Sequence, residues 1–200
     1  TVQAVNRPNI LFIFADDVGQ EVLQCYGGQS YRTPHLDELA RTGMKFNHAY
    51  SMPVCHPSRL ALMSGKYPFR HGQVTWGDFP KKEEPHTFAS YLQKAGYATA
   101  IAGKWQINDF RIQPQVLKEH GFDSWCMWTG YETGKPASGK RYWDPYIYTS
   151  GSKSRTYRGR FGPDVFTDFL VKFLEDNRES PMLVYFPMVL THGPVVHTPA

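Results

Sequence analysis

The chain has 200 residues, of which 41% are hydrophobic and 20% are charged, values that are typical of one folded domain and exclude a disordered chain. The net charge of +4 is too thinly spread for a nucleic-acid-binding surface, which needs a dense basic stripe. No run of about 20 apolar residues is present, so the sequence predicts no membrane span.

The first predicted element is a strand over Asn9–Ala15 (NILFIFA). Almost every residue in it is apolar, which is typical of a parallel strand that is buried on both faces. Asp16 and Asp17 follow at its carboxyl end, the edge of an open α/β sheet where ligands bind. Two adjacent carboxylates repel each other unless a cation or a basic group neutralises them, and hard cations prefer such oxygen ligands. The pair is therefore a candidate metal site, with a helix cap or a turn as the alternative.

Two helices and a short strand are predicted next. A helix over 33–43 has Thr33 as its N-cap and Gly43 as its end, and Lys45–Tyr50 is then predicted as a strand. A loop over 51–55 leads into a second helix, which begins at Pro57 and ends before Gly65. The apolar face of the first helix consists of Leu36, Leu39 and Ala40.

Strands and helices continue to alternate along the rest of the chain. A helix is predicted over Thr87–Ala95 with Phe88, Tyr91 and Leu92 facing inward, and a strand over Tyr97–Ala102. The stretch from 130 to 162, rich in Gly, Ser, Tyr and Arg, is predicted as a long loop or insertion. An amphipathic helix over Pro163–Asn177 and a buried strand over Met182–Met188 complete the pattern.

This alternation predicts an α/β fold, in which helices cover both faces of a mostly parallel central sheet as a three-layer α/β/α sandwich. Chemically active side chains repeatedly follow the predicted strands. Besides Asp16 and Asp17, Lys104 comes soon after the third strand and His192 after the fourth. Three such placements form a pattern that points to one functional edge of the sheet.

The sequence CHPSR, from Cys55 to Arg59, places a cysteine at the start of a helix. A helix N-terminus favours negative charge, so a thiolate or an oxyanion would be stabilised there. Arg59 lies one helical turn further on, where its guanidinium can present a fixed positive fork to an anion. Cys55 is therefore a candidate nucleophile, with an inert buried thiol as the alternative. His56 lies inside the motif, and its role stays open.

The other two cysteines, Cys25 and Cys126, form no CxxC pair, so neither a zinc site nor a redox motif is predicted. They could pair with each other or remain buried thiols, and their spacing does not decide between the two.

The motif from Cys55 to Gly65 resembles the signature of the type I sulfatases, a family of the alkaline-phosphatase-like superfamily. In that family a maturation enzyme oxidises the cysteine to formylglycine, whose hydrate supplies the attacking hydroxyl. The resemblance implies that Cys55 is the catalytic residue and that Arg59 stabilises it. Ser64 stands where many members carry threonine. The matching residues are Cys55, Pro57, Ser58, Arg59, Leu62 and Gly65.

Further blocks resemble the same family from about Arg7 to Pro194. They imply that Asp16 and Asp17, together with residue 55, are metal ligands, and that Lys104 and His192 contact the sulfate. These blocks are 7–17, 33–37, 43–46, 96–105 and 191–194.

Two departures from the family pattern stand out. Gln106 occupies the place where most members carry a histidine that acts as a base when sulfate is released. Glutamine can hydrogen-bond to a substrate but cannot take a proton, so either another group does this work or the step is altered. Family members are also considerably longer. The resemblance therefore implies that 1–200 is the N-terminal part of a catalytic domain, that the sandwich is incomplete on its C-terminal side, and that the remaining metal ligands lie beyond Ala200.

The function implied by the resemblance is that of a sulfuric ester hydrolase, acting on a carbohydrate or another small sulfate ester. It implies a divalent cation, Ca²⁺ in the first place and Mg²⁺ as the alternative, and a location in the periplasm or outside the cell, although no signal peptide is visible. One alternative is a phosphonate or phosphate ester hydrolase with the same chemistry. The other is a catalytically silent fragment that binds anions.

Overall fold

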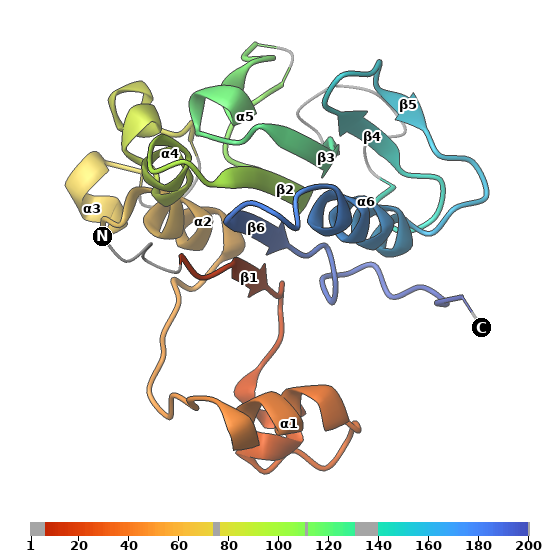
Figure 1. The fold of residues 1–200 in the computed structure, drawn as a ribbon. Helices are drawn as coiled ribbons and strands as arrows, with labels where there is room; N and C mark the ends of the chain where they lie inside the picture. The colour runs from red at the N-terminus through yellow and green to blue at the C-terminus, as the bar shows by residue number, and fades with distance from the viewer. Residues whose placement is uncertain (1–6, 74–76, 111, 131–139, 200) are drawn as a thin grey trace.

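The computed structural model describes residues 7–73, 77–110, 112–130 and 140–199. A mixed sheet of six strands in the order β1-β6-β2-β3-β4-β5 forms its centre (Figure 1). The strands are β1 (Ile10–Phe14), β2 (Ala98–Lys104), β3 (Ser124–Trp128), β4 (Tyr146–Thr149), β5 (Arg155–Thr156) and β6 (Met182–Pro187).

The first four strands of this order are parallel. Ile10 in β1 pairs with Leu183 in β6, and β2 pairs with β6 on one side and with β3 on the other. β4 and β5 then add to the sheet in antiparallel orientation. Because the parallel strands run the same way, their carboxyl ends lie along one edge of the sheet. The predicted α/β fold with a mostly parallel sheet is confirmed.

Helices and single turns connect the strands. Within the described residues there are six α-helices and three short 3-10 turns. They are η1 (Gln20–Val22), η2 (Gln24–Tyr26), α1 (Pro34–Thr42), α2 (Cys55–Ser64), α3 (Pro68–His71), η3 (Lys81–His86), α4 (Phe88–Lys94), α5 (Val116–Glu119) and α6 (Gly162–Asp176). None of these helices is both long enough and apolar enough to cross a bilayer.

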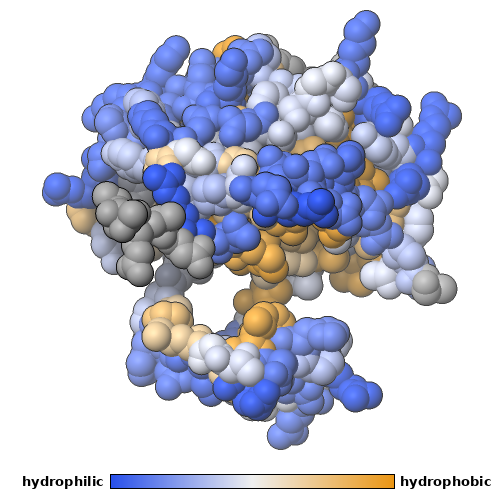
Figure 2. Space-filling model, in the orientation of Figure 1, coloured by the Kyte–Doolittle hydropathy of each residue, from blue (hydrophilic) through white to orange (hydrophobic). Residues whose placement is uncertain are grey.

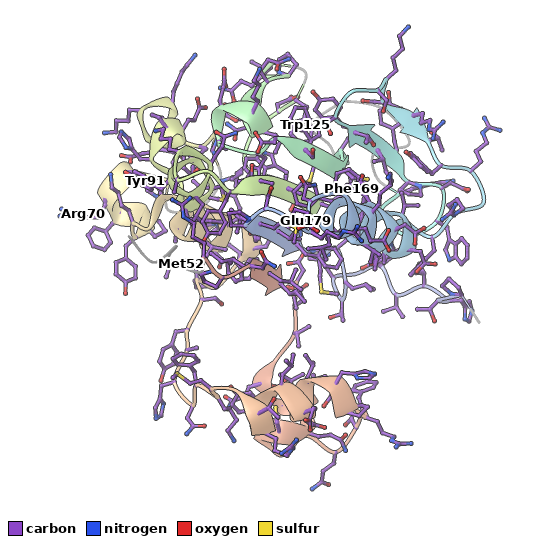
Figure 3. All side chains as sticks on the ribbon, in the orientation of Figure 1. Met52, Arg70, Tyr91, Trp125, Phe169 and Glu179 are labelled. Atoms are coloured by element: carbon purple, nitrogen blue, oxygen red, sulfur yellow. The ribbon has the colours of Figure 1, made fainter. Side chains whose placement is uncertain are left out.

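Two hydrophobic cores lie on opposite faces of the sheet. Successive residues of a strand point to opposite faces, and in β2 Ile101 joins one core while Ala100 and Ala102 join the other. α2 and α4 cover the first face, and α6 covers the second. Trp125 belongs to the first core and Phe169 packs against the second (Figure 3). The alternation along the strands therefore gives the three layers that the sequence predicts.

β1 is less buried than its composition predicts. It lies at the edge of the sheet, and the side chains of Leu11 and Ile13 are 56% and 51% exposed. Its alternate residues, Phe12 and Phe14, pack against the first core. Burial on both faces was therefore the wrong prediction, because the described helices cover β1 on one face only.

Residues 20–50, called here the projecting unit, stand away from the body of the molecule (Figure 1). α1 forms as predicted between Thr33 and Gly43, but Leu36 and Leu39 on its apolar face are 46% and 65% exposed. The predicted strand Lys45–Tyr50 is absent, since this extended segment has no neighbouring strand to pair with. Figure 2 shows hydrophobic surface on the projecting unit and on the part of the body that faces it.

Three other expectations differ from the structure. The segment 130–162 is not a plain loop, because β4 and β5 pair there in antiparallel fashion, while 131–139 lie outside the described residues. β3 has no counterpart among the predicted strands, and α2 begins at Cys55 rather than at Pro57. Tyr91 of α4 faces solvent instead of the core, since its ring lies on the outer side of the helix.

Candidate active site

The carboxyl ends of β1, β2 and β6 bring the chemically active residues of the sequence to one edge of the sheet. Asp16 follows β1, Lys104 is the last residue of β2, and Thr191 follows β6. Backbone hydrogen bonds join two of these ends, from Asp16 N to Leu190 O (2.9 Å) and from Thr191 N to Asp16 O (2.6 Å). The positions of the acidic residues are thus fixed by the backbone.

A cavity of about 520 Å³ opens at this edge. Its wall contains Asp16 and Asp17 from the end of β1, and Cys55 and Ser58 from the first turn of α2. Met52, which also lines it, lies where the projecting unit rejoins the body (Figure 3). The thiol and the carboxylate pair therefore face one common space, large enough for a small anion and part of its substituent.

Asp16, one of the residues in the wall of this cavity, lies between two buried cations. Its Oδ2 accepts a hydrogen bond from Lys104 Nζ and lies 3.6 Å from Arg59 Nη2. All three side chains are almost completely buried. One carboxylate against two cations leaves a net charge of +1 on the three groups, in a place where water cannot screen it. An anion bound beside them would offset this charge.

Arg59 is held in place by contacts on both sides of the guanidinium. Its Nη1 donates a hydrogen bond to Lys104 O (2.8 Å), and the group lies over the ring of Phe14, 5.5 Å from the centroid. The contact with Lys104 O ties the second turn of α2 to the end of β2. The two basic side chains thus keep a fixed distance from each other and from Cys55.

Cys55 is a free thiol at the start of α2. Its Sγ lies 3.7 Å from Lys104 Nζ and 3.8 Å from Gln106 Oε1. A group at this position therefore has a hydrogen-bond donor on one side and an acceptor on the other. Cys25 and Cys126 are also free thiols rather than a disulfide, and burial raises the pKa of Cys126 to about 12.

The backbone is strained at two places in the site. Across the described residues three non-glycine residues have a positive φ, and two of them are Asp17 (60°) and Gln106 (57°). Left-handed backbone is unfavourable for residues with a Cβ, and it persists where the surrounding contacts hold it. The chain thus turns sharply after β1 and after β2, which directs both side chains toward the edge of the sheet.

His192 joins the site from the loop after β6. Its Nε2 lies 3.8 Å from Asp17 Oδ2, and Arg141 Nη1 lies 3.0 Å from its Nδ1, which is also 2.9 Å from Gly193 O. Arg141 is buried and stacks over Trp128, with its guanidinium 4.4 Å from the ring centroid. The imidazole therefore lies between an acidic and a basic group.

Arg141 and Tyr142 are site residues that the sequence did not reveal. The Tyr142 hydroxyl donates to Val189 O (2.9 Å) and also contacts His192 O, so it fixes the loop that carries His192. Both residues precede β4, inside the stretch that its composition marks as a loop. Nothing in their sequence neighbourhood signals the contact, because the return of β4 along β3 creates it.

The donor set suits a hard cation in part. Asp16 and Asp17 supply carboxylate oxygens to the same cavity, which is the chemistry that Ca²⁺ and Mg²⁺ prefer. Ca²⁺ takes about six to eight oxygen ligands, more than two side chains can give. In the part of the chain that the structure describes, no three His, Cys, Asp or Glu side chains come together as a metal site. The residues present therefore fit one side of a cation site.

A family model described as Sulfatase matches residues 8–199. The chain belongs to the sulfatase family. It matches the alkaline-phosphatase-like type I sulfatases over nearly its whole length, as the motifs around Cys55 and Lys104 imply.

Curated relatives agree with this assignment. The chain is 30% identical over 193 residues to the N-acetylglucosamine-6-O-sulfatase of Bacteroides thetaiotaomicron, an alignment that covers 95% of this chain and 32% of the relative. It is 32% identical to the mouse N-acetylgalactosamine-6-sulfatase, covering 96% of this chain and 41% of the relative. With human steryl-sulfatase it is 36% identical over 172 residues, or 75% of this chain and 28% of the relative.

Solved structures share the fold. A protein solved with its substrate D-glucosamine-2-N,6-O-disulfate superposes with a TM-score of 0.77 at 29% identity, covering 94% of this chain and 35% of the other. The protein Ps i-CgsB superposes with a TM-score of 0.78 at 26% identity, covering 94% of this chain and 46% of the other. The chain thus spans between 28% and 46% of the length of these sulfatase relatives and solved structures.

Proposed function

We propose that this chain carries the nucleophile and part of the anion-binding site of a sulfuric ester hydrolase. The observation that carries the proposal is the position of Lys104. Its buried amine contacts both Asp16 and the Sγ of Cys55, so one cation touches the first carboxylate of the acidic pair and the candidate nucleophile together. Sulfate esters are anionic and repel a bare nucleophile, and a fixed positive charge at this place counteracts that repulsion.

The side chains around Cys55 have distinct roles in this proposal. Lys104 and Arg59 stabilise the charge that develops on the sulfate oxygens, since both are already desolvated and fixed. His192 contacts the sulfate from the opposite loop. Gln106 accepts a hydrogen bond from the group at position 55 through Oε1 but takes no proton, so it orients that group without acting as a base.

We propose that Cys55 is converted to formylglycine by a maturation enzyme. Its thiol sulfur stands where a hydroxyl of the hydrated aldehyde would be. Once formed, that hydrate supplies one hydroxyl that attacks sulfur and displaces the alcohol of the ester, and a second hydroxyl that, on losing its proton, expels sulfate and restores the aldehyde. The surroundings suit two hydroxyls, because Lys104 donates to this position and Gln106 accepts from it.

Asp16 and Asp17, together with residue 55, would hold a divalent cation. Calcium is the proposed ion and magnesium the alternative, since both prefer carboxylate oxygens. The bound cation would neutralise charge on the sulfate group. Asp16 already contacts two basic side chains, Arg59 and Lys104, which leaves its second carboxylate oxygen, Oδ1, for a cation.

The proposed substrate is a carbohydrate sulfate ester. This choice is supported by relatives named as N-acetylhexosamine sulfatases, by the neighbour solved with D-glucosamine-2-N,6-O-disulfate, and by Ps i-CgsB, solved with a neocarrahexaose. We also propose a periplasmic or extracellular location, which the resemblance to the type I sulfatases implies.

The proposal can be tested by mass spectrometry and kinetics together. Trypsin releases peptide 46–59, whose mass shows whether the thiol at position 55 has become an aldehyde. The protein is then assayed on glucosamine 6-sulfate, on an aryl sulfate and on the matching phosphate ester, with Cys55→Ala as the control.

We expect an aldehyde, faster cleavage of the sulfate esters, and no turnover by Cys55→Ala. Faster cleavage of the phosphate ester would instead indicate a phosphate ester hydrolase. A mature protein that binds sulfate but cleaves none of these esters would indicate a silent anion-binding protein.

A further inference from the structure

His56 is the residue next to Cys55, and it has no part in the reaction as described so far. It lies in the first turn of α2 and is almost completely buried. It does not contribute to the wall of the cavity that contains Cys55. A buried imidazole costs free energy unless it is hydrogen-bonded, so its partners indicate what it does.

The imidazole of His56 joins α2 to the segment that follows β2. Its Nδ1 lies 2.7 Å from the backbone oxygen of Gln106, and because a carbonyl can only accept, Nδ1 is the donor. The backbone of Gly77 is a second hydrogen-bonding partner of the ring.

Gln106 needs such an anchor more than its neighbours do. Its φ of 57° is in the left-handed region, which a residue with a side chain rarely adopts without support. In this conformation its side-chain Oε1 lies 3.8 Å from Cys55 Sγ. The hydrogen bond from His56 is made to the backbone of this same residue, so it acts on the direction in which the Gln106 side chain leaves the chain.

We propose that His56 is a positioning residue for the chemistry at position 55: its N–H holds the Gln106 carbonyl and thereby keeps the Gln106 amide against the reacting group. The inference rests on the proposed function for its kinetic consequences, while the contact itself is independent of it. His56 and Gln106 then act as a pair, in which the histidine orients the glutamine instead of touching the substrate.

The first experiment compares His56→Phe with His56→Asn in the mature protein. Phenylalanine keeps a ring but loses the donor, whereas the asparagine amide nitrogen can occupy the place of Nδ1. We expect His56→Phe to lower kcat about ten- to a hundredfold with little change in KM, as for other misplaced catalytic groups. His56→Asn should recover most of the loss. The formylglycine content of every variant is measured first, and rates are expressed per modified site.

A matched control is His86→Phe, since exposed His86 also has an Nδ1 contact, 3.1 Å from Tyr91 OH, away from the site. It should leave kcat unchanged. An unchanged kcat in His56→Phe would overturn the inference. So would equal losses in His56→Phe and His56→Asn, because these would point to a general packing role.

A double-mutant cycle with Gln106→Ala tests whether the two residues act as a pair. If His56 acts through the Gln106 amide, His56→Phe should cost little further kcat once that amide is gone. Losses that multiply would overturn the pairing.

A crystal structure of His56→Phe gives a readout that needs no activity. We expect the Gln106 amide to have moved away from residue 55, and an unmoved amide would contradict the inference. A protein without sulfatase activity would overturn the proposed function and leave this structural arm decisive.

Discussion

At the scale of single residues, Lys104 decides the charge balance of the site. Its amine contacts both the carboxylate of Asp16 and the Sγ of Cys55. Replacing it by methionine keeps the volume of the side chain but removes the positive charge. We expect Lys104→Met to lower kcat on a sulfate ester about 10²–10³-fold, as the loss of one preorganised charge-stabilising donor does. Steady-state kinetics at fixed formylglycine content measure this.

Lys94→Met serves as the control for this prediction, because Lys94 is exposed and contacts Pro85 O (3.2 Å) and the ring of Tyr91 (5.8 Å to the centroid), away from the site. Its kcat should match that of the unchanged protein. A Lys104→Met protein that keeps full activity would show that Lys104 is not part of the reacting site.

His120 makes a second residue-scale prediction, about stability and pH. It is completely buried between Phe79 and Trp105, with ring centroids 4.5 and 5.0 Å away, and neither ring nitrogen has a hydrogen-bond partner in the described structure. Desolvation lowers the pKa of His120 to about 3. The unfolded chain, in which the imidazole has its ordinary pKa of about 6.5, therefore binds this proton more readily than the folded one.

Because the unfolded state gains the proton first, the contribution of His120 to stability is present above pH 6.5 and is lost as the pH falls toward 3. The slope is up to about 1 kcal/mol per pH unit. Urea unfolding between pH 7 and pH 4 measures it, and His120→Phe should flatten the pH dependence. An equally steep dependence in His120→Phe would assign the acid sensitivity to other groups.

The sequence placed together the candidate site residues that belong to short motifs, and it missed those that depend on strand pairing. Asp16, Cys55 and Lys104 could be found because each lies at a strand end or a helix start, where sequence order predicts position in space. Arg141 reaches His192 only through the antiparallel return of β4, which no local pattern announces.

At the scale of elements, the contact between β2 and β6 carries Lys104 to its place. Gly103 has a φ of 118°, and a Cβ added there would lie 2.1 Å from Pro187 O in β6. Gly103→Ala must therefore push the two strands apart one residue before Lys104. We expect a loss of about 3 kcal/mol or more in the free energy of unfolding, from backbone strain and overpacking together. Chemical denaturation measures it.

Gly65→Ala at the end of α2 isolates the backbone part of this effect. Gly65 also has a positive φ (65°), but an added Cβ would meet no atom within 4 Å. It should cost only about 1 kcal/mol, from the left-handed conformation alone. Equal losses in the two variants would contradict the argument that β6 blocks a side chain at position 103.

The type of each helix or strand was predicted better than the burial of its faces. Apolar runs indicated β1, β2 and β6, and helical periodicity together with caps indicated α1, α2, α4 and α6, because these signals are local. Whether a face is covered depends on other segments. The exposure of Leu11 in β1 and of Leu39 in α1 could not be predicted for that reason, since their apolar character is that of buried residues.

At the scale of the whole molecule, the sheet and the helices on its two faces form the body, and the projecting unit adds no residue to either hydrophobic core. The unit is linked within itself, by hydrogen bonds from Gln24 N to Thr33 Oγ1 (3.0 Å) and from Cys25 N to Asp37 Oδ1 (2.7 Å). It meets the body through the two extended segments that join it to β1 and α2 (Figure 1). One of these segments contributes Met52 to the cavity, so the unit is connected to the site as well as to the fold.

The exposed edge of the sheet leads to the last prediction. β1 pairs with β6 on one side only, and Leu11 and Ile13 present an apolar face beside its unpaired backbone. Such an edge favours pairing with another chain, and we expect the 200-residue chain to form dimers or larger species at micromolar concentration. Light scattering coupled to gel filtration measures the mass.

The variant Leu11→Lys/Ile13→Lys should be monomeric, because a charged edge opposes pairing. Val171→Lys is the matched control, since Val171 is an exposed apolar residue of α6 and its replacement should leave the association unchanged. A monomeric unmodified chain, or association that persists in the double variant, would show that the edge of β1 is not the surface through which the chains meet.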